Sequence, residues 1–274
     1  MILPITCVIV IALATGCANL GQPAREEPTS SPTVLAEPTK RTEEALAALR
    51  RMSEFLASRP MLRFEADIQY DAVQESGQKL EFGSHRTFAL ARPDRIRVDI
   101  AHWNGEREMI AFDGDHLWAT LPESRIYASL AFTGNIPDAF DLLVNDYGLA
   151  SPLSDLLRRG LADEIADRVI SGRNLRTAMI GGVACDHLTF RGRNLDFQLF
   201  IQQGEEPVPV RFIIDYHAET GGPQFRAWLR DWDLAPALPD SLFQFSPEVG
   251  EQRVPFRELM DLVLGPLEMT MDEQ

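Results

Sequence analysis

The fold is decided by residues 88–127, FALARPDRIRVDIAHWNGEREMIAFDGDHLWATLPESRIY. Between positions 96 and 100, isoleucine and valine alternate with arginine and aspartate, which is the period of a β-strand with one buried face. Asn104-Gly105 and Asp113-Gly114 each follow such a strand, and these dipeptides supply the positive φ angles of two-residue hairpin turns. The stretch therefore predicts a meander of neighbouring antiparallel strands whose apolar face needs a cover.

The same strand pattern continues on both sides of this meander. Turn-forming residues, mostly glycine beside asparagine, proline or serine, separate the alternating segments. Together with the meander these segments predict an antiparallel sheet of about eleven strands. Outside the meander the predicted strands are residues 62–73, 80–90, 125–130, 175–180, 183–190, 196–201, 208–216 and 224–232.

Three segments have the spacing of helices instead. Residues 41–58 carry apolar side chains at helical intervals before Arg59-Pro60, which predicts an amphipathic helix. Residues 135–171 predict a helical insertion between two sets of strands, and residues 257–264 predict one short helix after an extended tail. The expected fold class is therefore mainly β with a helical lid, an α+β architecture.

Length and charge limit the possible functions. The chain has 274 residues, of which 45% are hydrophobic, and a formal net charge of -15. It is long enough to bury a large core. Because no basic cluster is available to neutralise phosphates, we expect no nucleic-acid partner.

The N-terminus predicts export. Residues 2–15 are almost all apolar, a run too short for a spanning helix but typical of a signal peptide. Residues 13–17, LATGC, resemble the lipobox of bacterial lipoproteins. This resemblance implies a lipoprotein-type signal over residues 1–16 and lipid attachment at Cys17. With Ala18 next, it implies an anchor on the periplasmic face of the outer membrane. An ordinary secretory signal or a plain N-terminal anchor is the alternative.

The remainder of the chain divides into two parts. Residues 17–40 are rich in proline, serine, threonine and glutamate, with little to bury. This composition predicts a disordered tether behind the lipid anchor. Residues 41–274 are predicted to form a single domain that includes the helical insertion.

The sequence favours neither catalysis nor a metal or cofactor site. Cys7 would be removed with the signal and Cys17 would carry lipid, so Cys185 is left without a disulfide partner. Cys185 and His187 share one face of a predicted strand and form the one candidate nucleophile and base. A lone strand cysteine is more often a small buried hydrophobe, and the histidines show no ligand spacing. We therefore expect a protein that is not an enzyme.

Five segments, in their order along the chain, carry a family resemblance. They are RPDRIRVDI, FDGDHLWATLPESRIY, GGVACDHLTF, DFQLFIQQGEEPVPVRFIIDY and PQFRAWLRDWDL. Over roughly residues 45–256 the chain resembles a family of uncharacterised predicted periplasmic proteins related to the LolA/LolB lipoprotein-carrier superfamily. The resemblance implies a strongly curved antiparallel sheet, an unclosed half-barrel with helices as a lid. In the carriers, the acyl chains of a lipoprotein lie between sheet and lid.

Strand alternation places one set of apolar side chains on the inward face of the sheet. They are candidate ligand contacts if the lid stands off from the sheet, and ordinary core if it does not. The set is Ile96, Val98, Ile100, Ile110, Phe112, Leu117, Phe197, Leu199, Ile201, Phe212, Ile214, Phe225 and Leu229.

Two functions follow from this surface. The first is binding of lipid or of the acyl chains of a lipoprotein, as a carrier, receptor or sensor. The second is a structural or regulatory envelope lipoprotein that binds a protein partner through the free edge of an unclosed sheet.

Overall fold

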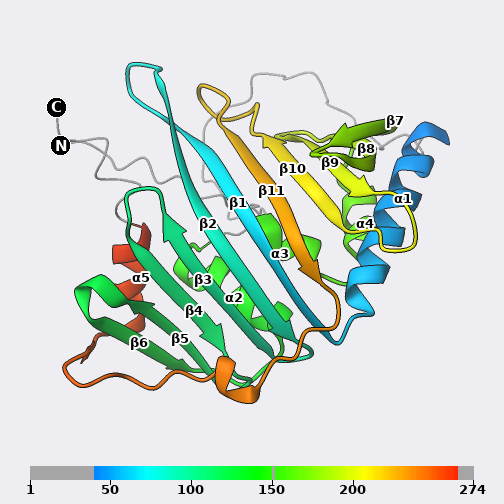
Figure 1. Ribbon diagram of the computed structural model, residues 1–274. Coiled ribbons are helices and arrows are strands. Elements are labelled where there is room, and N and C mark those ends of the chain that lie inside the picture. Colours follow the sequence, from blue (N-terminus) through cyan, green and yellow to red (C-terminus); the bar gives the residue numbers. More distant parts are fainter. Residues whose placement is uncertain (1–39, 150–151, 265–274) are drawn as a thin grey trace, which may run out of the picture.

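The computed structural model describes residues 40–149 and 152–264, and these residues form one twelve-stranded sheet with helices on one face (Figure 1). The strand order is β12-β6-β5-β4-β3-β2-β1-β11-β10-β9-β8-β7. The strands are β1 (Met61–Val73), β2 (Lys79–Ala91), β3 (Arg95–His102), β4 (Arg107–Phe112), β5 (His116–Leu121), β6 (Ile126–Ala131), β7 (Ser171–Ile180), β8 (Val183–Arg191), β9 (Asp196–Gln202), β10 (Pro209–Asp215), β11 (Gln224–Asp233) and β12 (Gln252–Arg253).

The predicted fold class is confirmed. Neighbouring strands pair antiparallel, apart from the short parallel pair β12–β6, and the sheet does not close on itself. The expected count of about eleven strands is one short, because β12 has only two residues and no alternation to reveal it. We call β1–β6 the first half-sheet and β7–β11 the second, and they join where β1 pairs with β11.

The two dipeptides of the deciding stretch lie in turns, but the connections are four residues (103–106) and three residues (113–115) long and not the two-residue turns predicted. Gly105 has φ 93° and Gly114 has φ 101°, values that glycine adopts without a steric penalty. The Asp113 carboxylate accepts hydrogen bonds from the backbone N–H groups of Asp115 and His116, at 3.0 and 2.8 Å. These turns hold β3, β4 and β5 side by side.

Five helices cover one face of the sheet, and Figure 1 shows α2 and α3 behind it. Helix α1 packs against β7 and β8, and α5 packs against β5 and β6. The helical insertion between β6 and β7 contains three helices, α2 to α4. The helices are α1 (Lys40–Ala57), α2 (Ile136–Tyr147), α3 (Pro152–Leu156), α4 (Leu161–Ala166) and α5 (Phe256–Leu264).

The opposite face, here called the open face, is crossed by the segment that follows β11. Phe243 is buried on Ala89 and Ala91, and the ring of Phe245 lies against Trp118 at 5.7 Å between centroids. The segment ends in β12 at the β6 edge. It therefore covers that edge, whereas β7 leaves the other edge of the sheet uncovered by any strand of the described residues.

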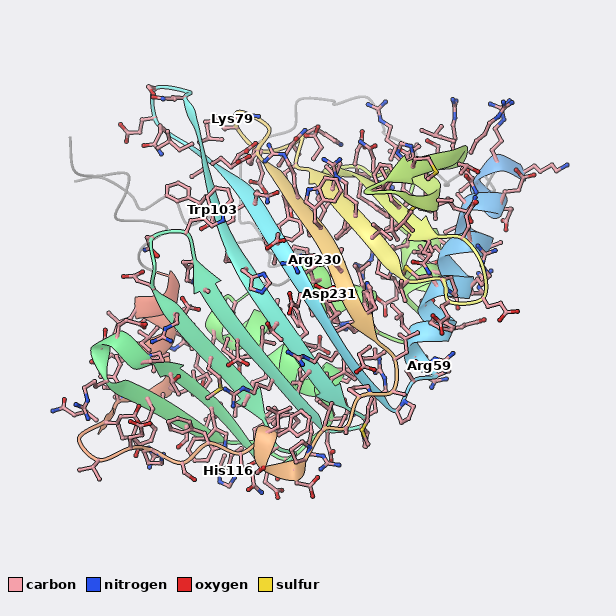
Figure 2. The ribbon with its side chains drawn as sticks, viewed as in Figure 1. Arg59, Lys79, Trp103, His116, Arg230 and Asp231 are labelled. Atoms are coloured by element: carbon pink, nitrogen blue, oxygen red, sulfur yellow. The ribbon has the colours of Figure 1, made fainter. Side chains whose placement is uncertain are left out.

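Charged pairs cover the middle of the open face (Figure 2). Arg230 on β11 donates to Glu65 at 2.8 Å and to Asp67 at 3.1 Å on the neighbouring β1. His85 on β2 lies 2.9 Å from Asp67. Polar side chains thus lie outside and apolar ones under the helices, as the alternation predicts. The signal, Cys17 and the proposed tether up to residue 39 lie outside the described residues.

Candidate functional site

The structure places the predicted lining residues on the helix-covered face. Cross-strand pairs such as Ile214 with Phe197, and Phe212 with Leu199, join them in rows across the sheet. All but Ile110 belong to one buried cluster and are at most 9% exposed, and half-buried Ile110 packs against that cluster. The buried set is Ile96, Val98, Ile100, Phe112, Leu117, Phe197, Leu199, Ile201, Phe212, Ile214, Phe225 and Leu229.

Two hollows of the described residues lie elsewhere. One of about 490 Å³ lies on the open face, between the sheet and the crossing segment, and is lined by His85, Arg97, Asp99 and Phe245 among others. Another of about 410 Å³ lies between the first turn of α1 and residues 173–176 of β7. A ligand on the helix-covered face would therefore have to displace side chains that now pack there.

The second half-sheet is tightly filled. Helix α1 buries Leu46, Leu49, Met52 and Leu56, and these side chains belong to the same cluster as the strand residues. A series of aromatic rings crosses β8 to β11, with centroids 4.8, 6.1 and 6.2 Å apart at successive steps. Such pairs add to the stability that apolar burial provides. This half is core in the ordinary sense.

The first half-sheet differs because polar side chains interrupt its helix-covered face. Ser84 and Arg86 of β2 have the same strand phase as buried Phe88, and they therefore point under the helices. Arg86 pairs across the sheet with Ala66 on one side and Ile100 on the other. Two further polar residues come from β3 and β4, because His102 pairs with Ser84, and Glu108 pairs with Ile100.

These four residues form an internal polar cluster. The Arg86 Nε donates to Ser84 Oγ at 3.2 Å, and His102 Nε2 lies 2.8 Å from Glu108 Oε1. The Glu108 side chain is only 9% exposed. Burial lowers the pKa of the Arg86 guanidinium, while the charges of Glu108 and Tyr70 act in the opposite direction. Arg86 is thus a desolvated charge within an apolar surface.

The cover of this half is looser than that of the second half. Helix α2 buries Ile136, Ala139 and Leu143, but Phe140 and Tyr147 on the same helix are only half-buried. The helix begins with a capping box in which Asn135 Oδ1 accepts from the Asp138 N–H at 3.0 Å. The partly exposed apolar side chains of α2 and the polar cluster of the sheet together define the candidate site, which comprises α2 and the helix-covered face of β1–β4.

The candidate nucleophile and base, Cys185 and His187, are not assembled. Cys185 is fully buried, and its Sγ lies 3.5 Å from the Val183 carbonyl oxygen. Burial raises the pKa of the Cys185 thiol, which disfavours the nucleophilic thiolate. His187 lies 2.9 Å from Gln198 Oε1 through Nε2 and stacks on Phe200 at 4.1 Å. Its ring is therefore engaged away from the thiol.

Within residues 40–149 and 152–264, no cluster of three or more histidine, cysteine, aspartate or glutamate side chains has the arrangement of a metal site. No helix of the described part of the chain is long and apolar enough to cross a membrane.

The polar cluster was missed in the sequence although a signal was present. Residues 82, 88 and 90 of β2 are apolar and share one phase, and serine and arginine occupy positions 84 and 86 of that phase. A break of this kind in an otherwise apolar strand face indicates either exposure or an internal polar site. Sequence alone does not show that β3 and β4 bring His102 and Glu108 to the same place.

Comparison with known proteins identifies the family. A family model described as "Predicted periplasmic protein (DUF2092)" matches residues 45–257, so the chain belongs to this family, as the resemblance predicted. No curated protein matches the chain.

Several solved structures are similar. An uncharacterised conserved protein from Thermus thermophilus has 14% identity and a TM-score of 0.44, covering 77% of this chain and 99% of its own. The Mycobacterium tuberculosis lipoprotein LppX has 13% identity and a TM-score of 0.43, covering 72% and 98%. A LolA superfamily protein from Nitrosomonas europaea has 14% identity and a TM-score of 0.37, covering 73% and 97%.

Proposed function

We propose that this protein is a non-enzymatic periplasmic lipoprotein that binds lipid or protein-linked acyl chains between the first half-sheet and helix α2. The observation that carries the proposal is the unequal cover of one continuous apolar face. Helix α1 buries nine of its 18 residues, whereas α2 buries three of its 12 and leaves Phe140 and Tyr147 half-buried. An acyl chain can replace contacts of α2 at the smallest cost there.

The energetics of such binding require no reactive group. Each methylene that leaves water contributes roughly 0.8 kcal/mol, so a chain that is only partly enclosed binds measurably. Entry requires α2 to move away from the sheet, because the predicted lining residues are already packed in one buried cluster. Helix α2 follows the loop after β6, and its fully buried side chains are Ile136, Ala139 and Leu143.

We further propose that Cys17 carries the membrane anchor, on the periplasmic face of the outer membrane. The proposal rests on the lipobox-like residues 13–17 and on the proline-rich segment that follows them. Such a segment of about 23 residues spans on the order of 25 Å if flexible. Cys17→Ser is expected to release the protein from the membrane fraction, and a wild type found soluble and unacylated would contradict the anchor.

The alternative, a protein partner bound at a sheet edge, is favoured by one observation. Strand β7 has no neighbour on its outer side among the described strands, and its Leu175 and Met179 side chains are 48% and 65% exposed. Unpaired edge strands are templates for an added strand. However, a register shift between Asn174 and Thr177 interrupts this edge, and bulges of this kind are a known defence against added strands.

The test of acyl binding uses a half-buried residue of α2. Phe140→Asp places a carboxylate where an acyl chain would lie, and we expect it to weaken palmitate binding about tenfold or more. Asn145→Asp adds the same charge on the exposed side of the same helix and is expected to bind as wild type does. The measurement is displacement of a fluorescent fatty acid from the full-length protein, with thermal unfolding of each variant.

Two results would overturn the proposal. A wild-type protein that binds no acyl probe and carries no copurified lipid in native mass spectrometry favours the protein-partner function. A folded Phe140→Asp variant that binds palmitate normally would remove α2 from the site.

A further inference from the structure

Arg86 is a buried cation that no described residue neutralises by direct contact. Its side chain makes one hydrogen bond to a described residue, from Nε to Ser84 Oγ at 3.2 Å, and no carboxylate of residues 40–149 or 152–264 forms an ion pair with it. By contrast, Arg226 and Arg230 on the open face each bond two or more carboxylates within 3.1 Å.

Arg86 retains partial solvent exposure, and burial is the largest influence on the pKa of its guanidinium. Its terminal nitrogens donate to no described residue. The Nε atoms of Arg92 and Arg211, in contrast, are sealed without a partner. The terminal N–H groups of Arg86 are thus left for a ligand atom.

The surroundings of Arg86 explain why its charge is left available. Glu108 is the nearest carboxylate to act on it, but Glu108 Oε1 is 2.8 Å from His102 Nε2. The cross-strand neighbours, Ala66 and Ile100, are buried and apolar. A lone buried charge is costly, and a structural role is better served by an apolar side chain of similar size. A charged side chain that occupies such a position despite this cost indicates a binding role.

We propose that Arg86 binds the anionic group, carboxylate or phosphate, of an amphiphile whose acyl chain lies along the apolar face of the first half-sheet. The inference rests on the proposed function and names its ligand class. Two terminal N–H groups of a guanidinium match the two oxygens of a carboxylate or phosphate in a bidentate pair. Glu108, which is hydrogen-bonded to His102 and pairs across the sheet with Ile100, would repel the same anion.

The experiment compares amphiphiles that differ only in charge. Palmitate and palmitoyl lysophosphatidate are the anionic probes, and monopalmitoylglycerol is the uncharged one, each measured below its aggregation concentration with the full-length protein. We expect wild type to bind an anion at least about tenfold more tightly than monopalmitoylglycerol. Preference for palmitate identifies a free fatty acid as the source of the anion, and preference for lysophosphatidate identifies a phospholipid.

Three variants locate this preference. Arg86→Met keeps the volume and removes the charge, so it is expected to abolish the preference for anions while monopalmitoylglycerol binding stays within about twofold. Glu108→Gln removes the opposing carboxylate and is expected to tighten palmitate binding by about two- to fivefold. Arg97→Met makes the same exchange on the open face of β3, where Arg97 pairs with Asp99 at 2.8 Å, and should change nothing.

The possible outcomes distinguish failure of the anion site from failure of the proposed acyl-chain binding. Equal binding of charged and uncharged probes, unchanged in Arg86→Met, overturns the anion site and leaves acyl binding intact. Binding of neither probe by wild type overturns both. If Arg86→Met does not fold, Arg86→Lys and Glu108→Gln decide. The site is supported if Arg86→Lys still prefers anionic probes and Glu108→Gln binds palmitate more tightly than wild type. It is contradicted if Glu108→Gln leaves the preference for anionic probes unchanged.

Discussion

The two half-sheets have the same strand pattern but differ in what their helix-covered faces contain. In the second half, β8 to β11 present leucine, isoleucine and phenylalanine on the helix-covered face, and the cluster includes Leu199 at 0% exposure. In the first half, β2 to β4 present Ser84, Arg86, His102 and Glu108 among the apolar residues. Both halves contribute to one buried core, but polar side chains interrupt the helix-covered face of the first half alone.

The covering helices show the same contrast. The first turn of α1 is tied to β7 by buried Thr42, whose Oγ1 accepts from the Gly172 N–H at 3.0 Å. Helix α2 is held at its start by an exposed capping box at Asn135. Buried hydrogen bonds are more costly to break than exposed ones. We therefore expect α2 to open at a lower free energy than α1.

The largest expected effect comes from a charge in the packed half. Leu199→Glu places an unpaired carboxylate at a position with 0% exposure, and we expect a loss of about 4 kcal/mol or more in the free energy of unfolding. Gln198→Glu is the control, since Gln198 is half-buried on the open face of the same strand. Thermal and urea unfolding give the measurement. A Leu199→Glu variant that unfolds at the wild-type temperature would show that this half contains a hydrated cavity.

A smaller loss is expected where α1 meets β7. Thr42→Val removes the acceptor of the buried Gly172 N–H, and leaving this group unsatisfied costs about 1–3 kcal/mol. The loss should appear as a lower urea midpoint for the whole domain, because α1 belongs to the packed core. Thr42→Ser keeps the hydroxyl and should recover most of the stability. A Thr42→Val variant as stable as wild type would show that this hydrogen bond contributes little.

The smallest effect on stability, about 1 kcal/mol, is expected from the cap of α2. Asn135→Ala removes the side chain that accepts from the Asp138 N–H, whereas Asn135→Ser retains a capping oxygen. We expect faster amide hydrogen exchange in α2 with little change in α1. Equal acceleration in both helices would show that the two covers open together, and the contrast between the half-sheets would then fail.

Much of the fold was predictable because alternation and turn chemistry are local. The strand phases of residues 96–100 and the turns at Gly105 and Gly114 agree with the structure. The first helix, predicted over residues 41–58, is Lys40–Ala57. Strand β7 begins at Ser171 and not at 175, because the register shift after Asn174 breaks the alternation there.

What was not predictable depends on contacts between distant segments. Phe200 has the phase of an outward residue, yet it is 6% exposed because His187 of the neighbouring strand stacks on it. Arg86 was not recognised as part of a site because its partners come from three strands. The packing of α1 against β7 and β8, which fills the second half-sheet, joins segments more than 100 residues apart.

The pairing of β1 with β11 has a consequence for how fast the protein folds. Ala66 and Leu229 are partners in this ladder, so the step that joins the two half-sheets must close a loop containing most of the domain. Loops of this length carry a large entropic cost, and such non-local pairing slows folding. Until β11 is in place, β1 presents an unpaired edge in the middle of the future sheet. The time during which that edge is exposed sets the interval in which the chain is most prone to aggregate.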